Sequence, residues 1–277
     1  MSPKIAIIYL SFHSDPHIDD AISAWKKLSY SKDNLAIVIV DNLHPKFGSS
    51  FRAIEERINS VEKGVLPNVI ILPQKENLGF AGGNNVGIQW ALDHGFDYIF
   101  LHNDDGFMAT NSLEALVGAM ENDKTIGIAQ SLILLHPDTE YINSAGNAYQ
   151  YLGFGFCNEY RTKFLDLKLP PVSDVGYTSG AAVLLRSDLL RRYGLWDKDF
   201  FMYHEDLEYT MRLKIAGFRA VVVRDSIFFH KYQFGRSIEK FFWMERNRIG
   251  VLIMFFRLPT LLLLLPMLIV LEAGLWL

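Results

Sequence analysis

The sequence predicts an α/β fold, with a mixed, mostly parallel sheet and helices on both of its faces. The main observation is an alternation along the first half of the chain, where β-branched runs are separated by stretches with apolar residues at helical spacing. Such alternation is typical of parallel strands joined by helices. The predicted strands of this half are residues 4–12, 35–42, 68–73 and 96–104.

A second observation is the position of polar side chains at the ends of these strands. Asp41 follows the second run, Asn77 lies just after the third, and Asp104 and Asp105 end the fourth. Sheets of this kind bind their ligands in a crevice beyond the carboxyl ends of the strands. We therefore expect these residues to line one ligand site.

The remaining elements follow from apolar spacing and from helix end signals. The helix that starts near residue 204 is closed by Gly217, and Leu207, Met211 and Ile215 are expected to form its buried stripe. Residues 136–173 are expected to be a loop-rich insertion. The predicted helices are 19–28, 49–64, 86–95, 110–123, 187–194 and 204–217, and the later strands are 126–135, 175–186 and 219–223.

Composition limits the class of protein. The chain has 277 residues, of which 50% are hydrophobic, and its 27 basic against 31 acidic residues give a net charge of -4, which excludes generic nucleic-acid binding. The single Cys157 excludes an intramolecular disulfide framework and a cysteine-based zinc site, and fits a reducing compartment. We expect one α/β domain at 1–235, no nucleic-acid partner and a cytoplasmic location, and leave the oligomeric state open.

The region 236–277 is expected to be helical and to associate with a membrane, peripherally or as an integral segment. Its apolar part from Leu258 to Leu271 is shorter than the ~20 residues of a spanning helix, which fits an interfacial helix at least as well as a span. Because the chain stops inside this apolar stretch, we expect either that it is cut there or that further membrane sequence once followed. Between residues 231 and 257, six lysines and arginines against two glutamates give a local net charge of +4. These cations form either a solvated face or a surface that binds anionic lipid.

The segment NLGFAGGNNVGI, residues 77–88, is expected to be a turn and a helix start beside the ligand crevice. Its glycines would let the backbone approach a ligand, and its asparagines would offer neutral hydrogen bonds. It is not a phosphate loop, because no lysine follows. Tight helix-on-sheet packing is the alternative for Gly83 and Gly87. The residues expected at the crevice are Asn77, Gly79, Gly82 and Asn84.

Carboxylates supply the candidate chemistry. Asp41 can cap a turn or bind a base or ribose, and its strand-end position favours binding. Asp104 and Asp105 form either a polar turn or an Mg²⁺ or Mn²⁺ site.

Glu205 and Asp206 begin a helix, where the dipole favours acids, but the aromatic residues before them favour a catalytic pair with Asp206 as general base. His230 is a structural hydrogen-bonding residue unless it meets Asp105.

In this order, the motifs resemble those of the inverting family 2 glycosyltransferases of the GT-A fold, particularly the rhamnosyltransferase-like enzymes. The resemblance spans residues 4–255 and rests on IVIVDN, NLGFAGGNNVGI, FLHNDD, TSGAAVLLR, HEDLEY, and a late His before GRS and ERNR. The loop DNLHPKFGSS differs from the polar run that usually follows the first Asp in this family.

The resemblance implies a role for each candidate residue. Asp41 would contact the nucleobase, Asp206 would deprotonate the acceptor hydroxyl, and His230 would be a further metal or phosphate contact. Asp105 would reach the metal and the diphosphate with Asn103 or Asp104 beside it, although HNDD leaves either aspartate possible as the metal ligand. Arg246 is a candidate to bind the negatively charged diphosphate.

The implied activity is transfer of a sugar from a nucleotide-diphosphate donor to a hydroxyl of a glycan or lipid-linked acceptor in cell-surface polysaccharide synthesis, with Mg²⁺ or Mn²⁺. The alternatives are a sugar-phosphate nucleotidyltransferase and a non-catalytic, membrane-associated nucleotide-sugar-binding protein. The first is disfavoured because no glycine follows the first strand, where a phosphate loop would lie.

Overall fold

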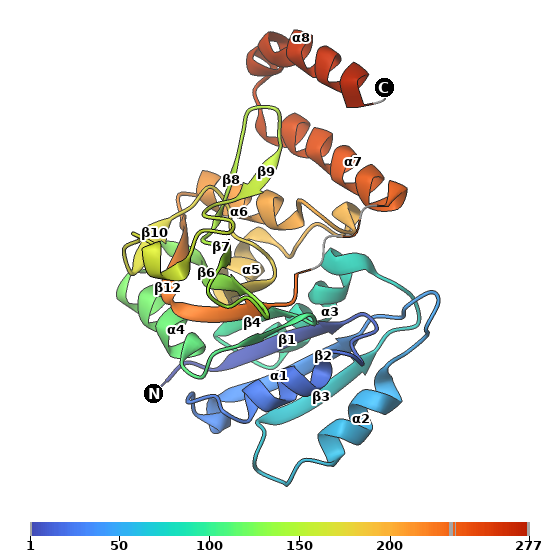
Figure 1. Cartoon of the computed structure of the whole chain (residues 1–277), viewed down its shortest axis with the longest axis vertical. Helices are drawn as coiled ribbons and strands as arrows, with labels where there is room; N and C mark the ends of the chain where they lie inside the picture. The colour runs from blue at the N-terminus through green and yellow to red at the C-terminus, as the bar shows by residue number, and fades with distance from the viewer. Residues whose placement is uncertain (1, 233–234, 236, 276–277) are drawn as a thin grey trace.

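The computed structural model describes residues 2–232, 235 and 237–275. Its centre is a ten-stranded sheet in the order β10-β12-β6-β11-β4-β1-β2-β3, with β5 paired to β12 and β7 to β6 (Figure 1). A separate hairpin contains β8 and β9. The strands are β1 Ile5–Ser11, β2 Leu35–Asp41, β3 Asn68–Pro73, β4 Tyr98–Asn103, β5 Gly106–Met108, β6 Ile126–Leu135, β7 Ile142–Ser144, β8 Asn147–Tyr149, β9 Gly155–Cys157, β10 Val172–Asp174, β11 Ala182–Arg186 and β12 Arg219–His230.

Helices account for most of the remaining regular structure. The α-helices are α1 Ile18–Trp25, α2 Phe51–Asn59, α3 Gly79–Asp93, α4 Ser112–Asn122, α5 Ser187–Tyr193, α6 Glu205–Ile215, α7 Ile238–Phe255 and α8 Leu258–Leu275. The short 3₁₀ helices are η1 Lys32–Asn34, η2 Phe164–Asp166 and η3 Lys198–Phe200.

Strand directions bring the predicted site residues to one edge. β1 is parallel to β2 and β4, β2 is parallel to β3, and β6 is parallel to β12, while β11 runs antiparallel between β4 and β6. In this register Ser11 lies beside Asp41, and Leu10 lies beside Asn103. The mixed, mostly parallel fold class is therefore confirmed, and the carboxyl ends of β1, β2 and β4 meet.

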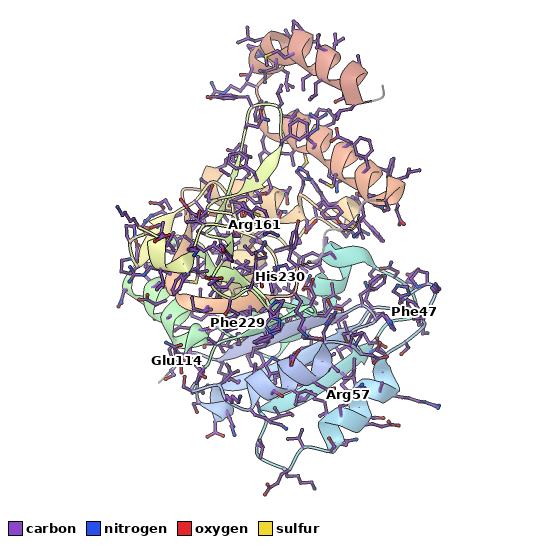
Figure 2. The ribbon with its side chains drawn as sticks, in the orientation of Figure 1. Phe47, Arg57, Glu114, Arg161, Phe229 and His230 are labelled. Atoms are coloured by element: carbon purple, nitrogen blue, oxygen red, sulfur yellow. The ribbon has the colours of Figure 1, made fainter. Side chains whose placement is uncertain are left out.

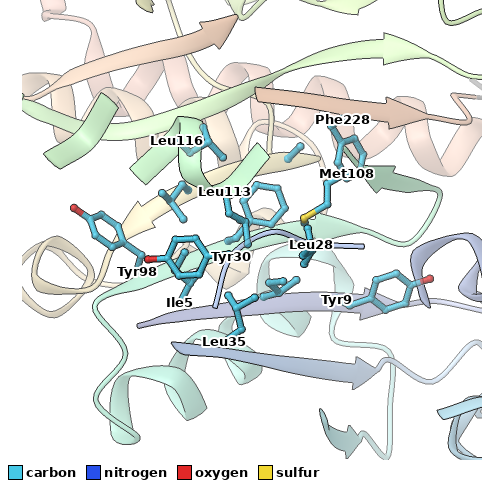
Figure 3. Packing of buried hydrophobic residues seen from close by; sticks show 14 of the residues in the cluster. Ile5, Tyr9, Leu28, Tyr30, Leu35, Tyr98, Met108, Leu113, Leu116 and Phe228 are labelled. Atoms are coloured by element: carbon cyan, nitrogen blue, oxygen red, sulfur yellow. The ribbon is translucent and has the colours of Figure 1, made fainter. Parts of the chain in front are cut away.

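Both faces of the sheet are covered, so the central strands are apolar on both sides. Ile5, Ile7 and Tyr9 of β1 pack with α1, α2 and α4 on one face, and part of this core is drawn in Figure 3. Ala6 and Ile8 pack with α3, α5 and α6 on the other face. The seven residues of β1 are all buried, which explains its run of β-branched residues.

Several elements differ from the prediction. α3 begins at Gly79, seven residues before the predicted start at 86. β12 continues through Asp225 to His230 and joins two apolar runs in one strand. The buried stripe of α6 was wrong at Ile215, which is 70% exposed. The reason is that α6 packs on two neighbours, with Tyr209 and Leu213 against the sheet and Leu207 toward α7.

The C-terminal region is helical, as predicted. α7 and α8 lie at the top of Figure 1, with the β8–β9 hairpin beside α7. None of the residues Leu258–Leu275 is buried, and with a mean hydropathy of 2.2 this helix is long and apolar enough to cross a membrane. Arg236, one of the six counted cations, lies outside the described residues. The domain boundary at 235 stays a prediction.

Candidate active site

The two acids after β4 point to different neighbours. Asp104 Oδ2 accepts the amide proton of Phe12, just after β1, at 2.9 Å. Asp105 Oδ1 lies 2.9 Å from His230 Nε2, at the end of β12, and 3.3 Å from Asn103 Nδ2. Figure 2 places His230 near the middle of the molecule. We expected His230 to be purely structural unless it lay beside Asp105. Its ring contacts Asp105, so His230 remains a candidate metal ligand.

The surroundings of Asp104 and Asp105 shift the pKa values of the two carboxyls in opposite directions. Burial, and then the charge of Asp105, raises the pKa of Asp104 to about 7. Burial would also raise the pKa of Asp105, but the hydrogen bond and charge of His230, with the Asn103 amide, outweigh it and hold that pKa below its usual range. At neutral pH the negative charge is therefore concentrated on Asp105, whose side chain is 32% exposed.

The sequence analysis missed the residue that orients His230. Asn143 of β7, inside the 136–173 insertion, places its Oδ1 2.8 Å from His230 Nδ1. As oriented here, each ring nitrogen faces an acceptor oxygen, and a neutral imidazole can donate to only one of them. The polar NSAGN cluster of the insertion was the available signal, but nothing in the sequence paired it with a strand 87 residues away.

Asp105 and His230 fit a divalent cation of the Mg²⁺ or Mn²⁺ kind. Their carboxylate and imidazole are suitable ligands, and a cation shared with Nε2 would satisfy the second ring nitrogen. Within the described part of the chain, no group of three or more His, Cys, Asp or Glu side chains could hold a metal. A cation here would take its other ligands from water or substrate oxygens, as these ions commonly do.

Asp41 is buried and supports the loop that follows β2. Its Oδ2 accepts from the Ser49 hydroxyl at 2.5 Å, and its Oδ1 accepts from the Ser50 amide at 3.1 Å. These contacts match the turn-capping alternative. They also fix the conformation of the loop DNLHPKFGSS at the carboxyl edge of the sheet. No contact tests the nucleobase role of Asp41, which stays a prediction.

Asn77 belongs to a network that the sequence analysis did not foresee. Asn42, buried next to Asp41, donates from Nδ2 to Asn77 Oδ1 at 3.0 Å and accepts the Leu78 amide at 2.8 Å. Asn77 Oδ1 also accepts the Gly79 amide at 2.9 Å. This network fixes the turn into α3.

The glycine segment packs more tightly on protein than expected. A Cβ on Gly79, where φ is +70°, would lie 2.5 Å from Phe201, whose carbonyl accepts the amides of Phe80 and Ala81. The start of α3 is thus capped by protein. A Cβ on Gly83 would meet Leu10 at 2.5 Å, as expected for helix-on-sheet packing.

Two other predicted crevice residues lie along α3. Asn84 is buried and donates from Nδ2 to Phe80 within the helix at 3.0 Å. Gly82 lines a surface hollow with Leu78 and Asn85. Their donor-binding roles stay predictions.

Asp206 and Glu205 are a buried acid pair at the start of α6. Burial raises the pKa of Asp206 to about 6, opposed by the amides of Gly180 and Leu207, which its carboxylate accepts at 3.2 and 2.7 Å. Burial, and then the charge of Asp206, raises the pKa of Glu205 well above its usual value. Glu205 is 5% exposed, and its Oε2 has no partner among the described residues.

The loop before Glu205 is strained and is held by α7. Phe201, Tyr203 and His204 have φ of 60°, 67° and 67°, a region that residues other than glycine seldom occupy. Asn247 donates to the carbonyls of Phe200, Met202 and Tyr203 at 2.7–2.8 Å. Backbone strain clusters at functional sites. Asn247, part of the ERNR motif, therefore positions the acid pair, a role that the sequence analysis missed.

A short backbone segment joins the two acidic centres. Ala181 accepts the Asn103 amide at 2.9 Å, next to the Asp105 centre. The preceding residue, Gly180, donates its amide to Asp206. The predicted metal residues and the predicted base therefore lie around one segment of the TSGAAVLLR motif.

Asp206 opens onto a cavity of about 360 Å³. The polar part of its wall includes Tyr177, His204, Glu205 and Asp206. Residues of the β8–β9 hairpin, α7 and the end of α8 complete it.

Arg246 lies on α7 against the loop around η3. Its Nη2 donates to the Asp199 carbonyl, and its guanidinium stacks over Trp243 at 4.6 Å. These contacts do not test the predicted diphosphate role.

The covered, mostly parallel sheet has the GT-A fold of its solved structural neighbours, with acids at its carboxyl edge. A family model described as "Glycosyltransferase like family 2" matches residues 3–248. The chain belongs to this family.

The chain is also similar to individual proteins. It is 25% identical over 248 residues to N-acetylglucosaminyl-diphospho-decaprenol L-rhamnosyltransferase of Mycobacterium tuberculosis, in two strains, covering 83% of this chain and 76% of the relative. Among solved structures, GalNAc-T7 with UDP, GalNAc and Mn²⁺ has a TM-score of 0.69 at 14% identity, covering 89% of this chain. S. aureus TarS 1-349 with UDP has a TM-score of 0.59 at 17% identity, covering 91%. The chain spans 47% and 66% of these two structures, which show the fold.

Proposed function

We propose that this glycosyltransferase is an inverting, metal-dependent enzyme that transfers a sugar from a nucleotide-diphosphate donor to a hydroxyl of a lipid-linked glycan acceptor. The observation that carries the proposal is the pair of acidic centres, Asp105 with His230 and Asp206 with Glu205, on either side of Gly180 and Ala181. Family membership favours transfer over the nucleotidyltransferase alternative.

The proposed reaction is a single displacement in which Asp206 is the base. The acceptor oxygen forms a bond to the anomeric carbon while the bond from that carbon to the diphosphate oxygen breaks, and the acceptor proton passes to Asp206. Attack opposite the leaving group inverts the anomeric centre. A pKa of about 6 suits this role, because the carboxylate is ionised at neutral pH yet basic enough to accept a proton.

The donor is proposed to bind at the carboxyl edge of β1, β2 and β4. Asp105 and His230 would hold Mg²⁺ or Mn²⁺ beside Asn103 and Asp104, and the cation would neutralise charge on the departing diphosphate. The loop supported by Asp41 would receive the base. Asn77, Gly79, Gly82 and Asn84 would form the adjoining wall, with Arg246 toward the diphosphate.

The acceptor and the location are proposed from the relative's name and from the C-terminal region. The M. tuberculosis protein is named for a diphospho-decaprenol acceptor and an L-rhamnosyl group. A lipid acceptor fits the apolar, unburied α8. We propose that the enzyme works at the cytoplasmic face of a membrane in cell-surface polysaccharide synthesis.

Thermal melting with a panel of nucleotide sugars, with and without Mn²⁺, tests the donor site. One donor should raise the Tm in the presence of Mn²⁺, and Asp105→Asn should abolish most of this shift because it removes a ligand charge. Asp138→Asn, in the 136–173 insertion, is the control and should keep the full shift. The proposal fails if no nucleotide sugar raises the Tm of the wild-type protein with Mn²⁺ present.

A further inference from the structure

The cavity beside Asp206 has two chemically different sides. One side carries His204, Glu205 and Asp206. The other is largely apolar and comes from the β8–β9 hairpin, α7 and α8: Phe154, Phe241, Met244 and Leu275. Such a cavity fits an amphipathic ligand.

The polar side has a group that the described protein leaves unsatisfied. Glu205 Oε2 is buried and has no hydrogen-bond partner in the described chain. The ring of His204 is buried as well, with the Gly153 backbone as its hydrogen-bonding neighbour. Burial lowers the pKa of His204 to about 4, so its imidazole is neutral at physiological pH. Buried polar groups are normally paired. A hydroxyl group of a bound sugar would supply the missing partner.

A buried arginine also lines the cavity beside Asp206. Arg248 of α7 lines the cavity and is almost completely buried. Its Nη1 donates to the Leu152 carbonyl at 2.7 Å, and its Nε donates to Glu245 at 2.9 Å. The guanidinium also lies over the Phe154 ring at 4.6 Å. The hairpin and α7 thus hold this cation in a fixed position.

A second carboxylate contact of Arg248 comes from α8. Its Nη2, which also lies 2.7 Å from Glu245 of α7, donates to Glu272, the single acidic residue of α8. None of the residues of α8 is buried. An arginine removed from water needs anionic partners. Here Glu245 on α7 supplies one carboxylate, and Glu272 on the lightly packed α8 supplies a second. A phosphate oxygen binds a guanidinium in the same way as a carboxylate oxygen.

We infer that Arg248 binds an anionic, phosphate-type group of a lipid-linked acceptor, and that Glu272 occupies this position until the acceptor arrives. The inference rests on the proposed function and specifies how its acceptor is recognised. The sugar of the acceptor would lie toward Asp206 and Glu205. Its apolar chain would leave along Phe241, Met244 and α8.

Calorimetric titration of the 277-residue chain in detergent micelles tests the inference. The probe is farnesyl diphosphate in buffer with EDTA, and farnesol and inorganic pyrophosphate are titrated separately. Farnesyl diphosphate should bind more tightly than either, because it alone combines the anion with an apolar chain. Glu272→Gln should tighten its binding about tenfold by removing the competing carboxylate. The exposed Glu239→Gln removes the same charge from α7 and should leave the Kd unchanged.

Two results would overturn the inference. The first is equal affinity for farnesol and farnesyl diphosphate, which would leave no anion-binding role for Arg248. The second is unchanged or weaker binding of farnesyl diphosphate by Glu272→Gln. That result would make the Arg248–Glu272 ion pair a structural link between α7 and α8. Arg248→Gln should lose the preference for farnesyl diphosphate over farnesol, and Glu272→Gln still decides if that variant does not fold. Because no donor and no metal are present, failure here leaves the donor-binding test unaffected.

Discussion

At the scale of single residues, burial of Glu205 and Asp206 at the start of α6 lowers the stability of the fold and makes Asp206 more basic. Asp206 and Glu205 are buried without a basic side chain, and their carboxylates rely on backbone amides and the helix dipole. An ionised carboxyl in such a place is costly. Because the pKa of Asp206 is raised to about 6, the folded protein binds its proton more tightly than the unfolded chain does.

Asp206→Asn should lose activity and gain stability. Transfer should fall by about 10²–10⁴-fold, as expected for loss of a general base. In the wild type, the raised pKa makes stability fall as pH rises from about 4 to about 6, and the full penalty remains above pH 6. The variant should therefore melt higher than wild type at pH 8, with little difference at pH 4. Sugar transfer and melting curves at both pH values measure this.

Asp188→Asn is the matched control, since Asp188 is an exposed acid in the first turn of α5. It should keep activity and show no such gain at pH 8. Undiminished transfer by Asp206→Asn would reject the base assignment. A wild-type kcat/KM that does not decline below about pH 6 would argue against it as well.

At the scale of elements, the packing of α3 on β1 and β2 holds the carboxyl edge together. A Cβ on Gly87 would lie 2.5 Å from Ile8 and 3.2 Å from Val40, so glycine allows the helix axis to approach the sheet closely. Gly83 and Gly87 therefore act through packing on the sheet, and Gly79 acts through its positive φ and its contact with Phe201.

Gly87→Ala should destabilise the protein by about 1–3 kcal/mol, because the methyl group overpacks the interface. Gly118→Ala, within α4, is the control: a Cβ there has no neighbour within 4 Å, and the change should stabilise by about 0.5–1 kcal/mol. Urea denaturation of both variants measures the difference. Equal effects of the two substitutions would contradict the packing role of Gly87.

At the scale of the whole molecule, α8 adds an apolar surface beyond the region 3–248 that matches family 2. The exposed side chains of α8 include Leu262, Leu263 and Val270, an arrangement typical of a membrane contact. Fewer cations are free than the local balance of +4 indicated. Lys231 pairs with Asp20 and Arg248 with Glu272, two acids outside the 231–257 count, and Arg246 is held by the neutral Asp199 carbonyl. We therefore expect the apolar surface, more than charge, to drive membrane binding.

Leu263→Asp should weaken binding to phosphatidylcholine vesicles at least tenfold, because Leu263 is 79% exposed on α8 and a charge there opposes insertion. Leu165→Asp provides the control, since Leu165 is 94% exposed but lies in η2, away from α8. Vesicle co-sedimentation measures both. The same assay with phosphatidylglycerol vesicles should give similar binding, and strict dependence on anionic lipid would point to charge instead.

Local patterns determined much of this protein. Alternating β-branched and helical runs specify the order of β1, α1, β2, α2 and β3, because each pattern depends on neighbours in the chain. The motifs also indicated the family and the edge of the sheet where Asp41 and Asp105 lie. They failed where burial depends on two partners, as at Ile215.

Only the tertiary structure decided which distant residues meet. The pairing of β12 with β5 and β6 brings His230 to Asp105, and β7 adds Asn143 from the insertion. Likewise, α7 and α8 join Arg248 to Glu272 beside the acid pair. These contacts depend on strand order and helix packing across long sequence separations. The sequence therefore determined the elements and the chemical groups, and the fold determined which groups share a site.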